Sequence, residues 1–248
     1  MKALKFNLSG ETAFFKKPDV NTYLYFTYGN IHKVAVLGIV GAVLGLKGYN
    51  DQEKEEYPEF YKELSSLRIA IVPRNDRGYI SKKVQIFNNS VGYASQEEGG
   101  NLIVKEQWLE KPEWEIYICL TQNPYAEEIE SRFLNGSFQY VPYLGKNDHF
   151  ANIKDIEVVE LTEASSFLNM DSLFIKSYFD FAVEDEFEFS LEDLDIEEKW
   201  KYEEKLPISL EPTSNQYVTD SFIFTNMKLS LKEEYKLYSD NNRTLFFF

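Results

Sequence analysis

An uncharged stretch between Val34 and Leu46 constrains the fold of this chain more than any other feature of its sequence. Glycines at positions 38, 41 and 45 share roughly one side of a helix in this stretch. A helix that is apolar all round belongs in a protein core or in a membrane, and a membrane span needs about 20 apolar residues. Because this stretch is shorter, we expect a core helix. Glycine costs about 1 kcal/mol relative to alanine inside a helix, so we expect a close approach to a strand or another helix as compensation.

The surrounding segments predict a mixed α+β fold. Residues 2–8 alternate between apolar and polar side chains, as in a half-buried strand. Further strands are predicted at 67–72, 80–87, 114–120 and 155–161, and helices at 50–66 and 125–134. Weak strand character at 91–94 and 102–105 predicts a protruding hairpin. The order β-α-β-β-α-β with an inserted hairpin is that of a ferredoxin-like unit, whose sheet serves RNA-recognition domains as an open platform.

The predicted domain organisation is a ferredoxin-like domain at 1–162, with a thumb hairpin near 88–110, and a smaller β-rich domain at 163–248. The second domain is aromatic and acidic, and residues 184–204 hold 11 Asp and Glu. No EF-hand spacing occurs there, so we expect a solvated acidic face rather than a metal site. Strands are predicted at 216–224 and 244–248, and Phe246–Phe248 is expected to join a sheet or to contact a partner.

Charge is distributed unevenly along the 248 residues, whose net charge is −15. Residues 1–110 hold 14 Lys and Arg against 13 Asp and Glu, whereas the remainder holds 12 against 28. This asymmetry favours a first half that faces a polyanion and a second half that faces proteins or solvent. Cys119 is the only cysteine and is expected to pack in the core. We find no signal peptide or spanning segment, so a cytoplasmic protein is expected.

Several groups of residues resemble those of one known family. They are Gly10 with Ala13–Phe15, Thr22 with Tyr23, the glycine-bearing segment Leu37–Leu46, and Tyr140–Lys146, with a fainter similarity at Tyr202–Pro207. Together they are similar to the CRISPR-associated "Cas-five" family of the RAMP superfamily, and most to its type I-B branch. The chain departs from many members at Phe26–Asn30, where those have prolines.

The resemblance implies a non-catalytic subunit of a type I Cascade surveillance complex in antiviral defence. Such a subunit has a RAMP domain of RNA-recognition type with a hairpin thumb, and it grips the five-prime handle of the guide RNA. Its implied partners are the guide RNA (crRNA), the backbone and large Cascade subunits and, through the complex, target DNA. No cofactor, metal or membrane is implied.

Carried over by position, the resemblance also implies a set of RNA contacts. They are Lys16, Lys17, Asn30, His32, Lys33, Arg74, Lys82, Lys83, Gln85 and Lys105. The residue types support this interpretation, because Lys and Arg bind phosphates and aromatic rings stack on splayed RNA bases. We expect these residues to form a cationic edge on an open four-stranded platform.

Two other functions fit the sequence. A metal-independent endoribonuclease that processes the guide-RNA precursor, as in the type I-C branch, would need a general base and acid. Only His32 and His149 titrate near neutrality without a large shift, and each is more often structural. A protein-only interaction scaffold would suit the acidic second half.

Overall fold

The computed structural model describes residues 1–18, 23–52, 54–121, 123–164, 167, 169–181, 198–241 and 243–248. Its centre is an antiparallel sheet of β1 (Lys2–Ser9), β3 (Ile69–Pro73), β6 (Glu113–Cys119) and β7 (Asn152–Glu160), in the order β3-β6-β1-β7. Helix α1 (Lys33–Leu44) follows β1, and α3 (Ala126–Leu134) follows β6. The elements of this unit therefore run β-α-β-β-α-β along the chain, as the sequence predicts.

One face of the central sheet packs against the helices. Leu4, Phe6 and Leu8 of β1 are fully buried, and the Phe6 ring lies 5.0 Å from that of Phe133 in α3. The alternation in the sequence correctly predicts this buried face.

Helix α1 packs closely against the short helix α2 (Glu59–Leu64), which is shorter than the helix predicted at 50–66. A Cβ added to Gly41 would lie 2.6 Å from the Cβ of Phe60 in α2. Gly45 ends α1 in the left-handed conformation, with a φ of 83°. The predicted close approach of a second helix is thus confirmed at Gly41.

The other face of the central sheet is covered by the end of the chain, which corrects the expectation of an open platform. Ala70, Tyr117 and Cys119 are buried against Leu245 and Phe247. The covering strands are β14 (Tyr238–Asp240) and β15 (Arg243–Leu245), which form a small sheet with β8 (Thr162–Glu163). Covering this face with a second layer is favourable, because it removes the apolar surface of these side chains from water.

The last residue also bonds to the edge of the central sheet. Ile69 of β3 and Phe248 exchange backbone hydrogen bonds of 3.1 and 3.0 Å. The strand predicted at 244–248 is therefore shorter in the structure, where β15 ends at Leu245, and the three rings of Phe246–Phe248 are buried.

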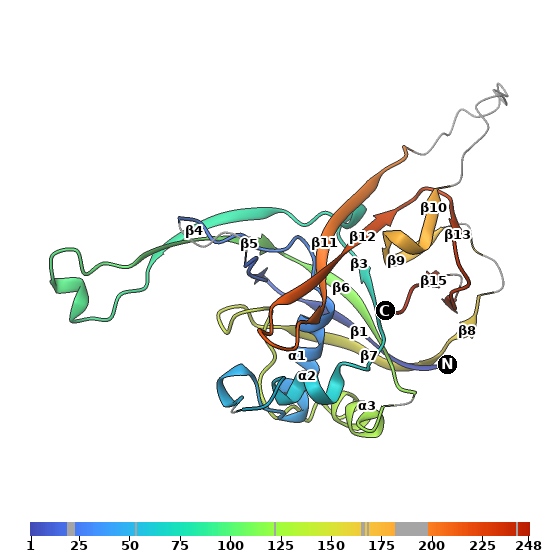
Figure 1. Cartoon of the computed structure of the whole chain (residues 1–248), viewed down its shortest axis with the longest axis horizontal. Coiled ribbons are helices and arrows are strands. Elements are labelled where there is room, and N and C mark those ends of the chain that lie inside the picture. The colour runs from blue at the N-terminus through green and yellow to red at the C-terminus, as the bar shows by residue number, and fades with distance from the viewer. Residues whose placement is uncertain are drawn as a thin grey trace.

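A long hairpin projects away from the side on which both termini lie (Figure 1). It is formed by β4 (Lys82–Asn88) and β5 (Ile103–Glu110), with β2 (Thr12–Ala13) on the other edge of β5. The segment predicted at 80–87 is thus the first strand of the hairpin and not part of the central sheet. The strand predicted at 91–94 is wrong, because the 3-10 turn η3 (Ala94–Gln96) lies there.

The remaining strands form two further sheets. They are β9 (Met170–Ile175), β11 (Lys201–Leu210) and β12 (Tyr217–Thr225), in the order β11-β12-β9, and the pair β10 (Phe179–Phe181) with β13 (Leu229–Leu231). Short 3-10 turns lie at η1 (Tyr49–Asp51), η2 (Asp76–Gly78) and η4 (Lys176–Tyr178). Among the described residues, none of the helices is long and apolar enough to span a bilayer.

One hydrophobic cluster draws residues from both predicted domains, including Leu4 and Leu37 from the first and Phe174 and Phe222 from the second. The division at residue 162 stays a prediction. Of the acidic segment at 184–204, residues 184–197 lie outside the described residues.

Candidate nucleic-acid interface

A groove of about 1000 Å³ lies between α1, the hairpin and two loops. Helix α1 contributes Val34 and Gly38, and the hairpin contributes Phe87 and Val104. Residues 46–51 and 140–146 supply the two loops, and Phe14, Lys16 and Tyr25 add further lining from the first part of the chain. Its charged lining residues are Lys16, Lys47, Asp51, Glu106 and Lys146.

Two of the groove's lysines lie over aromatic rings. The Nζ of Lys16 is 4.2 Å from the ring centre of Tyr25, and Lys16 is exposed. The Nζ of Lys146 is 5.6 Å from the ring centre of Phe14 and 5.4 Å from that of Phe87. Such pairs hold a cation in place while leaving part of its surface for an anion.

Lys146 is also paired with carboxylates. Its Nζ lies 3.0 Å from Oε1 of Glu106, which is 5% exposed, and 3.4 Å from Asp148. The Nε1 of Trp108 donates a 2.8 Å hydrogen bond to Oε2 of Glu106. An anion that binds Lys146 therefore competes with a carboxylate that is fixed in place.

The loop that carries Lys146 is anchored to the first residues of the chain. Gly145 has a φ of 90°, and a Cβ there would lie 1.9 Å from the backbone oxygen of Phe14. His149 follows in this loop, with its Nδ1 2.6 Å from Oγ1 of Thr12 and its ring 4.6 Å from that of Trp108. Burial lowers the pKa of His149 and so favours its neutral form. These contacts position Lys146 at the groove.

Lys17 and Lys82 come together outside the groove, around a carboxylate of β11. Glu204 accepts hydrogen bonds from Nζ of Lys17 at 2.6 Å, from the N–H of Gly29 at 2.8 Å and from the hydroxyl of Tyr202 at 2.6 Å. Burial lowers the pKa of Lys82, and Glu204 opposes that shift. A residue of the acidic half thus occupies the position at which a phosphate would meet these lysines.

The sequence predicts that Asn30 and His32 contact RNA, but both side chains are bonded inside the protein. Asn30 is fully buried, donates to the backbone oxygen of Gly78 at 3.0 Å and accepts from Nε1 of Trp114 at 2.8 Å. His32 is 3% exposed and caps α1, where its Nδ1 accepts from the N–H of Ala35. Neither side chain is therefore available to bind RNA, because buried polar groups need these partners.

The remaining predicted contacts do not form one cationic edge. Lys82 and Lys83 point to opposite faces of β4, since neighbours in a strand alternate, and Lys83 lies 3.5 Å from Glu110. Arg74 is exposed in the turn after β3. Lys33 is partly buried, which lowers its pKa to about 8.

The last two predicted contacts lie on the two faces of the hairpin. Gln85 is opposite Glu106, on the face that carries Phe87. Lys105 is exposed on the other face, opposite Ile86. The single continuous surface expected from the sequence is therefore absent from the described residues.

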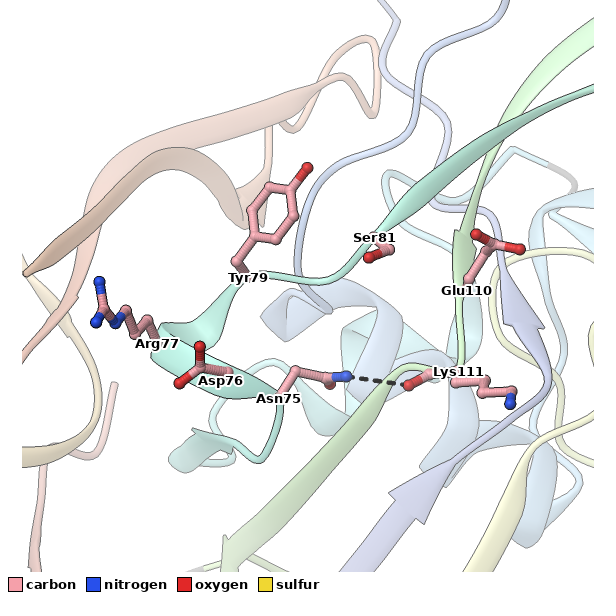
Figure 2. A pocket seen from close by; sticks show the side chains of 7 residues that line it. All are labelled: Asn75, Asp76, Arg77, Tyr79, Ser81, Glu110 and Lys111. Carbon is pink, nitrogen blue, oxygen red and sulfur yellow. Dashed lines mark hydrogen bonds between the residues drawn. The ribbon is translucent and has the colours of Figure 1, made fainter.

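A second hollow, at the base of the hairpin, is the weaker candidate (Figure 2). Asn75 joins its two sides by donating to the backbone oxygen of Lys111 at 3.1 Å and accepting from the N–H of Glu113 at 3.0 Å. Figure 2 shows Arg77 pointing away from the other side chains, and it pairs with Glu198 at 2.7 Å. The charges of its lining residues balance, so nothing there favours an anion.

Sequence reasoning missed three of the groove's residues as contacts. Lys146 and Tyr143 lie in the segment 140–146 that carries the family resemblance, so a signal was present but was not assigned a role. Tyr25 lies in an aromatic run that suits a core equally well. Among the described residues, we find no group of three or more His, Cys, Asp or Glu side chains arranged to hold a metal ion.

Comparisons with known proteins show a shared fold. No protein-family model and no curated protein matches the sequence. The crystal structure of a CRISPR protein from Archaeoglobus fulgidus is similar over 99% of this chain and 98% of its own, with a TM-score of 0.53 and 11% identity. A chain of a CRISPR RNA-guided surveillance complex is similar over 93% of this chain and 91% of its own, with a TM-score of 0.53 and 10% identity. The chain therefore has the fold of CRISPR-associated proteins, in agreement with the resemblance seen in its sequence.

Proposed function

We propose that this protein is a non-catalytic RNA-binding subunit of a type I Cascade complex, and that its groove holds the five-prime handle of the guide RNA. The observation that carries the proposal is the pair of lysines, Lys16 and Lys146, held on aromatic rings in one groove. The cations would bind phosphates and the rings would stack on bases, the two contacts that single-stranded RNA offers.

The proposal includes a finer reading of the fold. The central sheet with α1 and α3 is the ferredoxin-like domain of the RAMP superfamily, and the β4–β5 hairpin is its thumb. The match to a chain of an RNA-guided surveillance complex supports this assignment. The acidic second half would face neighbouring Cascade subunits, target DNA would be reached through the complex, and the setting would be the cytoplasm. A type I-B origin rests on the sequence resemblance alone.

RNA binding is tested with a labelled single-stranded RNA that carries a CRISPR repeat from the genome that encodes the protein. We expect binding that weakens as salt rises, because counterions return to the phosphates. Lys16→Glu with Lys146→Glu should weaken binding at least about tenfold and make the salt dependence shallower by about 1.4 in log–log slope, at about 0.7 for each lost contact.

The matched control is Lys154→Glu with Lys205→Glu, which makes the same change in net charge at exposed positions outside the groove lining. An equal loss in both double variants would show that net charge alone matters, and would overturn the assignment of the groove.

The absence of catalysis is also a proposal. His32 is buried, and its pKa is lowered to about 3, which suits a structural cap better than a proton carrier at pH 7. Incubation of the purified protein with repeat RNA in EDTA should leave the RNA intact. Cleavage at one position that is lost in His32→Ala would instead support the endoribonuclease alternative.

A further inference from the structure

Gly38 has no packing reason to be a glycine. The other two glycines of this helical segment do have one, because Gly41 touches Phe60 and Gly45 takes a positive φ. At Gly38, an added Cβ would meet no atom within 4 Å, although a helix interior favours alanine over glycine. The absence of a side chain at Gly38 therefore leaves open space, and no close contact within the protein requires a glycine there.

That space belongs to the groove. Gly38 lines it together with aromatic side chains from several other segments, among them Tyr25, Phe87 and Tyr143. The cations of Lys16 and Lys146 lie on rings of the same lining. Bare helix backbone, stacking surfaces and cations are thus combined in one cavity, and a nucleotide presents a planar base and a phosphate within a few ångströms of each other.

We propose that one nucleobase of the bound single-stranded RNA lies against α1 at Gly38, in the space that a side chain would fill. This inference rests on the proposed function and names the part of the groove that takes a base. The backbone groups of a helix interior are already hydrogen-bonded to one another. The base is therefore held by surface contact and stacking, so the site accepts any base.

The test is a double-mutant cycle between the protein and the RNA. The repeat RNA described above is synthesised as a set in which each molecule lacks one base at a different position. Gly38→Leu fills the space, and Gly38→Ala fills less of it. Ser131→Leu, at an exposed position of α3, is the matched control for the added side chain. Thermal unfolding of every variant shows that it is folded.

Gly38→Leu is expected to bind the intact RNA about tenfold more weakly, the effect of losing one base contact, while Ser131→Leu binds normally. At one position, removal of the base should weaken binding to the unchanged protein about tenfold and have no further effect on Gly38→Leu. Gly38→Ala should lose less affinity while its melting temperature rises.

Three results would overturn the inference. Losses that multiply at every abasic position would show that no base contacts Gly38, as would normal binding by Gly38→Leu. In both cases the intact RNA still binds the unchanged protein, so the proposed function survives. Failure of the unchanged protein to bind the RNA would instead remove the proposed function and this site with it.

Discussion

At the scale of single residues, the groove's cations are held in place by rings and carboxylates. Lys16 lies on Tyr25, and Lys146 lies between two rings and against Glu106. The rings fix each ammonium group without neutralising it, whereas Glu106 does neutralise Lys146 in part. If the groove binds RNA as proposed, its affinity for a phosphate should therefore depend on Glu106 as well as on the lysines.

Glu106→Gln should raise the affinity for repeat RNA severalfold. The variant frees the Lys146 cation, and the amide oxygen can still accept the hydrogen bond from Trp108. Binding titrations at two salt concentrations measure the change, which should be larger at low salt. Glu233→Gln, at an exposed position, makes the same change in charge and should have little effect. Unchanged affinity in Glu106→Gln would show that the RNA does not contact Lys146.

His32 should make the protein sensitive to acid. Burial lowers the pKa of His32 in the folded state to about 3, below its usual value of about 6.5, so the unfolded chain binds a proton more readily between these values. Stability is therefore complete above pH 6.5 and falls as the pH drops, by about 2 kcal/mol at pH 5.

His32→Asn keeps a capping side chain but has no proton to bind. The difference in free energy of unfolding between His32→Asn and the unchanged protein should shift by about 2 kcal/mol in favour of the variant between pH 7 and pH 5. Denaturant unfolding at the two pH values measures this shift. A difference that does not change with pH would show that burial does not lower the pKa of His32.

At the scale of elements, the three glycines of the α1 segment have different structural roles. Gly41 allows α2 to approach, Gly45 ends the helix, and Gly38 faces open space in the groove. The three glycines form one regular pattern in the sequence. In the structure, one allows close packing, one ends the helix and one lines the groove.

Alanine substitutions in α1 should have opposite effects on stability. Gly41→Ala places a methyl group 2.6 Å from Phe60 Cβ, which cannot move away cheaply, and should cost about 1–3 kcal/mol. Gly38→Ala meets nothing and should gain up to about 1 kcal/mol. Denaturant unfolding of the two variants decides the matter, and effects of equal sign would contradict these contacts.

At the scale of the whole molecule, the two halves of the chain are packed into each other. The end of the chain covers one face of the central sheet, and Glu204 of β11 binds Lys17 near the start. The first half cannot offer the open sheet that RNA-recognition domains use, because that face is already buried. Binding is therefore expected in the groove beside the sheet rather than on it.

Phe247→Ala should strongly destabilise the protein. Its ring is fully buried in the layer that covers the central sheet, and removing a buried phenylalanine side chain costs about 3–5 kcal/mol. Phe150→Ala, whose side chain is 70% exposed, is the control and should change stability little. Equal unfolding midpoints in urea would mean that the tail does not cover the sheet in solution.

Much of the fold could be predicted from the sequence, and less of the site. The alternation in β1 and β6 predicts strands correctly, and the uncharged segment predicts α1. The site is built from residues that are far apart in the sequence. Lys16 and Lys146 line the same groove only after the chain has folded. Asn30 and His32 resemble binding residues in sequence, yet their polar atoms stabilise the entry to α1.

The sequence by itself determined most strands and helices of the first half, and the apolar face of β1, because local periodicity and glycine placement act over a few residues. Only the tertiary structure decided what covers each apolar face. In the structure, β4 belongs to the hairpin and not to the central sheet. The end of the chain covers one face of the central sheet, and Lys17 pairs with Glu204. The burial of apolar surface is not directional. The pattern of a strand therefore predicts that its apolar face is covered, but not which segment covers it.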